Sequence, residues 1–167
     1  MNNIEHYKLM AQYNQWMNKS LYAVCARIPD DQRKQDRSAF FKSIHGTLNH
    51  ILWADTAWLG RFTNVPLNLT RMGEDLFEDF DELTAEREKT DDQIQDWVAG
   101  LDNDWLGRSF SFTSVSDKVT RTAPAWKFVS HMFNHQSHHR GQVTTLLKQS
   151  GYEPPVTDIP WMPGVLE

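Results

Sequence analysis

The segment HMFNHQSHHRGQ, residues 131–142, holds four of the seven histidines in the chain: His131, His135, His138 and His139. Imidazole is the commonest protein ligand for metal ions, and two imidazoles one helical turn apart can share a cation. His135 and His139 have this spacing, so a metal site is one interpretation of the segment. The other is that these are satisfied histidines at the surface or at the edge of a core, because such pairs also arise by chance in a histidine-rich segment.

The helix that would carry these histidines has one broad apolar face. That face contains Phe128, Val129, Met132, Phe133, Val143, Leu146 and Leu147. At about 100° per residue, His139 falls inside the face and His135 at its edge. His131 and Gln142 lie further round the helix, and His138 further still. We therefore expect His135 and His139 to point partly into the fold.

A metal ion needs more than two ligands, and the helix with the histidine cluster contains no Asp or Glu. A further ligand must come from elsewhere in the chain. The segment SIHGTLNHILWAD, residues 43–55, offers His45, His50 and Asp55. Small residues near His50 would leave room for a cation and a substrate; they are Gly46, Ala54 and Ala57.

Asp55 would project into the middle of an apolar helical stripe, which is an unusual place for an unpaired carboxylate. It could orient a ligand histidine from behind. It could equally pair with an arginine or accept a hydrogen bond from a tryptophan N–H. We favour the structural role, in which an arginine or a tryptophan is the partner.

The composition narrows the class of protein. The 167 residues carry a formal net charge of −5 and no cluster of Lys or Arg, so nucleic acid is a poor candidate partner. No apolar run approaches the ~20 residues that span a membrane, and the N-terminus does not have the pattern of a signal peptide. The single cysteine, Cys25, excludes an internal disulfide and favours a cytoplasmic location and an inert, buried thiol over a nucleophilic one.

Four stretches have helical periodicity, at about 4–27, 41–62, 83–101 and 125–150. Ser43 is a plausible cap for the second helix, and Gly151 follows the last one. Alternating residues at 109–122 predict a small β-hairpin or an extended segment in the long crossover before the last helix. We expect one domain, residues 1–167, with the fold of an all-α antiparallel four-helix bundle.

Three motifs together resemble the DinB-like family of metal-binding four-helix-bundle proteins. HQSHHRGQ is similar to its His-xxx-His-Arg-Gly-Gln signature, SIHGTLNHILWAD to its second-helix motif and YNQWMNKSLY to its first helix. The resemblance implies that the metal ligands are His50, His135 and His139. It gives His131 and His138 no ligand role, although His131 could line the cavity. Arg140 and Gln142 match the signature, and we interpret them as groups that pack the helix or support a ligand, while His6 and His45 are assigned no site role.

The resemblance also implies a function class. Three neutral imidazoles leave a divalent ion, zinc or nickel, with an unfilled position that can bind a thiol or water. Similar family members include transferases and isomerases that use a low-molecular-weight thiol, so a thiol-dependent transferase acting on a small molecule is our first hypothesis. The alternatives are a metal-dependent hydrolase and a non-catalytic metal-binding protein of the stress response.

Assembly is the last expectation from the sequence. Seven tryptophans, nine phenylalanines and six methionines are a large apolar content for this length. We reasoned that Trp16, Trp53 and Trp58 cannot all share one face of one core, and the family resemblance also suggests association. A homodimer is therefore expected.

Overall fold

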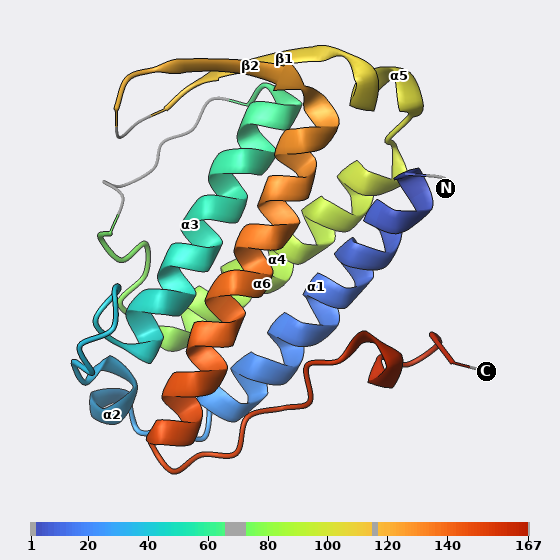
Figure 1. The fold of residues 1–167 in the computed structure, drawn as a ribbon. Helices are drawn as coiled ribbons and strands as arrows, with labels where there is room; N and C mark the ends of the chain where they lie inside the picture. The colour runs from blue at the N-terminus through green and yellow to red at the C-terminus, as the bar shows by residue number, and fades with distance from the viewer. Residues whose placement is uncertain (1–2, 66–72, 115–116, 167) are drawn as a thin grey trace.

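Four long helices dominate the computed structural model, which describes residues 3–65, 73–114 and 117–166 (Figure 1). They are α1 (Asn3–Cys25), α3 (Ile44–Thr63), α4 (Phe80–Ala99) and α6 (Ala125–Gln149). Helices α1 and α6 run in one direction along the bundle, and α3 and α4 run in the other. The antiparallel pairs α1/α4 and α3/α6 pack most closely. This arrangement confirms the expected all-α bundle.

The shorter elements cover the ends of the bundle. Two short helices that the periodicity did not predict, α2 (Asp30–Lys34) and α5 (Asn103–Gly107), follow α1 and α4. The expected hairpin is present as strands β1 (Ser109–Thr113) and β2 (Thr120–Pro124), paired antiparallel. It lies between the end of α4 and the start of α6, over one end of the bundle (Figure 1). The C-terminal segment is irregular apart from a 3-10 turn at Ile159–Trp161.

The start of α3 differs from the sequence-based expectation. Ser43 is the N-cap, as predicted, and its side chain accepts a hydrogen bond from the backbone N–H of Gly46. The helix therefore begins at Ile44 and not near Phe41, because Lys42 has a left-handed backbone (φ 64°) that breaks the helical path before the cap. At the other end, Asn64 also takes the left-handed conformation and closes the helix.

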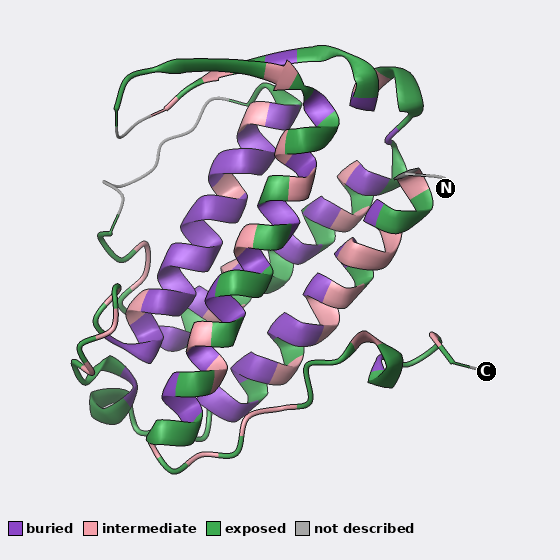
Figure 2. Ribbon diagram, viewed as in Figure 1, coloured by how far each residue is buried: buried purple, intermediate pink, exposed green. Residues whose placement is uncertain are grey.

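Buried residues face the inside of the bundle along all four long helices (Figure 2). The apolar core divides into two main clusters, one around Leu21, Leu48 and Leu147 and the other around Trp58, Ile94 and Val129. Between them lies a layer of buried polar side chains: Asn14, Asn18, Asp55, Arg87, Asp91, Gln136 and Arg140. None of the described helices has the length and apolar content of a membrane span.

The tryptophan argument for a dimer is not supported by the packing. Trp53 and Trp58 are both buried within the single chain, and Trp16 is partly buried against the first cluster. A monomer can therefore accommodate all three. The homodimer itself stays a prediction, as does the cytoplasmic location.

Candidate metal centre

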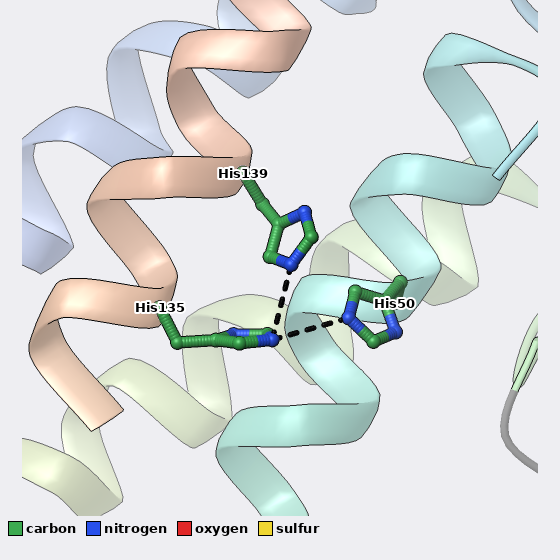
Figure 3. Close-up of side chains that lie close together, drawn as sticks. All are labelled: His50, His135 and His139. Carbon is green, nitrogen blue, oxygen red and sulfur yellow. Dashed lines mark hydrogen bonds between the residues drawn. The ribbon is translucent and has the colours of Figure 1, made fainter. Parts of the chain in front are cut away.

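Three histidines from the facing helices α3 and α6 converge at the middle of the bundle. His50 comes from α3, and His135 and His139 come from α6, with their rings turned toward one another (Figure 3). The Nε2 atom of His135 lies 3.0 Å from Nε2 of His139 and 3.2 Å from Nε2 of His50. One nitrogen from each ring lies within 4.8 Å of the others.

The local sequence explains how the three rings meet. His135 and His139 are one turn apart on α6, so their side chains stack on the side of the helix that faces α3. The packing of α6 against α3 then brings His50 opposite them, 85 residues away in the chain. His50 and His139 are buried, and His135 is half-buried. The triad therefore lies between two packed helices and is not a surface cluster.

Gln142 determines which nitrogen of His139 carries the proton. Its Oε1 lies 2.8 Å from Nδ1 of His139. An amide oxygen only accepts hydrogen bonds, so Nδ1 must be the N–H and Nε2 must present its lone pair to the triad. On its other side, Nε2 of Gln142 lies 3.3 Å from Nε2 of His138. The sequence predicts that Gln142 either packs the helix or supports a ligand, and in the structure it contacts a triad histidine.

The electrostatic surroundings keep the triad uncharged at neutral pH. Burial, helped by the neighbouring His139, lowers the pKa of His50 to about 4. Burial and the other histidines lower the pKa of His135 to about 3, and burial also lowers that of His139. Neutral imidazole is the form that binds metal ions.

Hydrogen bonds among the three histidines cannot satisfy all of their Nε2 atoms at once. Since Nε2 of His139 carries no proton, His135 must donate its own Nε2–H to make that contact. A ring N–H has a fixed direction, so the same proton cannot also serve the contact with His50. The Nδ1 atoms of His50 and His135 are buried without a partner among the described residues. Three lone pairs directed at one divalent ion would satisfy all three Nε2 atoms, so the donor set fits a divalent metal ion.

Asp55 does not reach the triad. Its carboxylate accepts hydrogen bonds from Arg87, at 2.7 Å, and from Gln136, at 2.9 Å. Burial raises the pKa of Asp55, and Arg87 acts in the opposite direction. The arginine-paired structural role that we favoured is the one observed.

The other histidines of the sequence analysis lie outside the triad. His131 is exposed, and its ring centroid is 5.8 Å from that of His135. His138 is exposed and contacts Gln142. His45 is buried away from the site, with its Nε2 2.9 Å from the carbonyl oxygen of Phe77. Among the described residues, no carboxylate or fourth histidine joins the three at ligand distance.

Sequence reasoning missed Phe41. Its ring stacks on that of His50 with a centroid separation of 3.7 Å and an interplanar angle of 16°. The same ring makes a T-shaped contact with that of His139, with a centroid separation of 5.6 Å and an interplanar angle of 66°. We had placed Phe41 in the first turn of the helix, and only the extra loop residues before the Ser43 cap bring it over the triad. The pair Phe40–Phe41 before a capping serine was the available signal.

Comparisons with known proteins agree with this architecture. A sequence model of the DinB family matches residues 1–165. Protein DinB of Bacillus subtilis (strain 168) is 25% identical over 156 residues, which are 88% of this chain and 87% of that protein. A solved structure of a DinB-like protein from Bacillus cereus ATCC 10987 superposes with a TM-score of 0.61, covering 92% of this chain and 94% of that one, at 19% identity. At that identity the structural likeness concerns the fold.

Proposed function

This chain belongs to the DinB family, and from that premise we propose that it binds a divalent metal ion through Nε2 of His50, His135 and His139 and acts on a small molecule. The observation that carries the proposal is the convergence of three uncharged ring nitrogens within 4.8 Å in a partly buried groove. Zinc and nickel are the ions we propose, since both accept imidazole.

A divalent ion held by three neutral imidazoles supplies Lewis acidity and lowers the pKa of a bound thiol or water. The chain's own residues prepare the site for this chemistry. Gln142 holds His139 in the tautomer whose Nε2 is a free lone pair, and Phe41 shields one side of His50 from water. The triad has no carboxylate, so an ion bound there keeps its full positive charge. This charge favours an anionic ligand, and a thiolate is the one we propose.

The reaction class that we propose is transfer of a group to or from a low-molecular-weight thiol. A 400 Å³ groove is lined by His138 and Gln142, and Gln142 contacts His139. A small molecule in this groove could therefore contact a side chain that touches His139. Hydrolysis through a bound water would use the same ion and stays an alternative.

The burial of the triad favours a second candidate function. His50 and His139 are each only 8% exposed, and Phe41 lies on His50. A metal ion enclosed in this way would suit a non-catalytic metal-binding protein of the stress response. Such a protein would associate with partners through the surface of its bundle, and in either case we do not propose nucleic acid as a partner, because the net charge of −5 does not favour phosphate binding.

The test is metal analysis followed by a reaction screen. Protein purified without a histidine tag should contain about one zinc or nickel ion per chain, as three-histidine sites hold one ion. Metal-loaded protein is then screened for conjugation of small thiols to electrophiles, with chelator-treated protein and His135→Ala as controls. Activity that requires both the metal and His135 supports the transferase. Metal-loaded protein without any such activity favours the non-catalytic candidate, and protein that binds no metal rejects both.

A further inference from the structure

The loop between α2 and α3 carries two adjacent phenylalanines with opposite surroundings. Phe40 is 84% exposed, whereas Phe41 is half-buried against the triad. The Phe41 ring stacks on that of His50 and makes a T-shaped contact with that of His139. Phe41 also lines a cavity of 710 Å³, whose walls include the neighbouring Phe40 and Lys42 as well as Asp75 and Glu78. The lining of the cavity does not include His50, His135 or His139, so Phe41 belongs both to the cavity wall and to the surroundings of the triad.

The loop has a defined conformation that positions the ring. The backbone N–H of Arg37 donates to the carbonyl oxygen of Lys42 at 2.7 Å, and the backbone N–H of Lys42 donates to the carbonyl oxygen of Ala39 at 2.8 Å. Ser38 and Lys42 both take left-handed backbone angles, with φ of 56° and 64°. Residues with a Cβ atom seldom adopt this conformation unless the surroundings impose it. The loop is thus a tight turn whose tip bears Phe40 and Phe41.

Gly46 makes the close approach of this loop to α3 possible. A Cβ atom built at Gly46 would overlap the carbonyl oxygen of Phe41. The atom in the way belongs to the backbone, so it cannot move aside as the end of a flexible side chain would. A larger residue at position 46 must push the loop outward and with it the Phe41 ring. The glycine in the first turn of α3 therefore has a role in the site although it touches no ligand.

We propose that Phe41 is a specificity-determining residue, which closes the His50 side of the centre to the 710 Å³ cavity, and that Gly46 is the residue that positions it. The inference rests on the proposed function in one respect, that the three histidines are the centre of activity. With the ring in place, no ligand reaches the centre through this cavity. A small ligand such as a short aliphatic thiol then reaches the three histidines only from another side. Without it, the cavity joins the centre, and bulky ligands gain access to His50.

The test measures access to His50 directly, with and without metal. In chelator-treated protein, diethyl pyrocarbonate acylates accessible imidazoles, and mass spectrometry gives the rate for each histidine. Phe41→Ala should raise the rate at His50 about tenfold, because removing a packed ring leaves space that its neighbours fill only in part. Gly46→Ala should raise it in the same direction. Phe40→Ala is the matched control, from the same loop and residue type, and should leave the rate within about twofold of wild type, because an exposed ring covers little.

A second readout uses zinc-loaded protein and a bulky colorimetric chelator. Zinc should transfer to the chelator faster from Phe41→Ala than from Phe40→Ala or wild type. Phe41→Leu, which keeps an apolar side chain, serves if circular dichroism shows that the alanine variant is unfolded. Equal acylation of His50 in the Phe40 and Phe41 variants would overturn the inference. If the wild-type protein binds no zinc, the proposed function is rejected. The acylation experiment uses metal-free protein, so it would still show whether Phe41 covers His50.

Discussion

The carboxylate of Asp55 on α3 accepts a hydrogen bond from Nη1 of Arg87 on α4 at 2.7 Å, and both side chains are buried. The other terminal nitrogen of Arg87 lies 2.8 Å from the carboxylate of Asp91, which also accepts hydrogen bonds from Asn14 and Asn18. These contacts join α1, α3 and α4 in one polar layer at the centre of the bundle.

The same layer extends to α6, beside the metal centre. Gln136 donates to Asp55, and Arg140 donates to the side-chain oxygen of Asn14. In the sequence Gln136 follows His135 and Arg140 follows His139, so the layer holds the part of α6 that presents the triad. Because unpaired buried polar groups are costly, a shift of α6 along α3 that separated Gln136 from Asp55 would be unfavourable. We infer that this network sets how His50 faces His135 and His139.

Replacing Arg87 with methionine should destabilise the fold strongly. The change leaves the carboxylates of Asp55 and Asp91 buried without their cation, and breaking a buried pair in this way costs about 3–5 kcal/mol. Urea unfolding followed by circular dichroism measures the free energy of unfolding. Arg121→Met is the control, since it breaks an exposed pair with Asp117 and should leave the unfolding midpoint unchanged. An Arg87 variant as stable as wild type would contradict the structural role of the layer.

Replacing His50 with alanine should abolish tight metal binding while leaving the bundle folded. The apolar clusters do not include His50, so their packing does not depend on a metal ion. We expect the affinity for zinc to fall by more than about 100-fold, beyond the effect typical of outer-shell changes. Competition with a chelator measures the affinity, and His131→Ala is the control from the edge of the triad. Comparable losses in both variants would reject the proposed ligand set.

Replacing Gln142 with leucine should weaken zinc binding less than loss of a ligand does. The variant removes the acceptor that keeps the proton of His139 on Nδ1, and losing such a partner costs about 10–100-fold in affinity. Gln149→Leu provides a matched change at an exposed position of the same helix. The rank order of zinc affinities should be wild type and Gln149→Leu first, then Gln142→Leu, then His50→Ala. Unchanged affinity in Gln142→Leu would mean that the contact has no part in binding.

The metal-free protein should lose stability as the pH falls from 6.5 toward 5. In the unfolded chain His50 and His135 take up protons near pH 6.5, whereas in the folded protein their pKa values are about 4 and about 3. The unfolded state then binds more protons, so the free energy of unfolding decreases with falling pH, by up to about 1.5 kcal/mol per histidine across this window. Urea midpoints of chelator-treated protein at pH 7.5 and 5.0 measure the loss. It should be smaller in His135→Gln, and an equal loss in that variant would contradict the assignment.

The homodimer remains a prediction with a separate test. Trp126 and Trp161 are exposed in the single chain, whereas the three tryptophans of the sequence argument are not. Light scattering at micromolar concentration should give twice the mass of the chain, 19.5 kDa. A mass of one chain would reject the dimer without bearing on the metal centre.

The sequence by itself determined the features that depend on neighbouring residues. Apolar periodicity located the four long helices, Ser43 marked the start of one and Gly151 followed the end of another, and alternation identified the hairpin. The one-turn spacing of His135 and His139 already placed two rings on one side of a helix. These are local properties, because the geometry of a helical turn or a strand is set by residues a few positions apart.

Only the tertiary structure decided which distant groups meet. The composition of α4 does not show which of its charged residues are buried. Arg87 and Asp91 are buried because the facing helices supply Asp55, Asn14 and Asn18 as partners. The sequence favoured a structural role for Asp55 but could not decide between an arginine and a tryptophan as its partner, since that depends on which helix packs beside it.

The same holds for the centre itself. From the residues alone, His45, His50 and Asp55 were all candidates for the third ligand, and the family resemblance was needed to select His50. The structure selects it by packing, because α3 turns His50 toward α6 and turns His45 toward the carbonyl of Phe77. Phe41 could not be found from periodicity, since its place over His50 requires a left-handed turn and a glycine that admits the loop against α3. Contacts between segments far apart in the chain are decided by how whole helices and loops pack, and no short stretch of sequence contains that information.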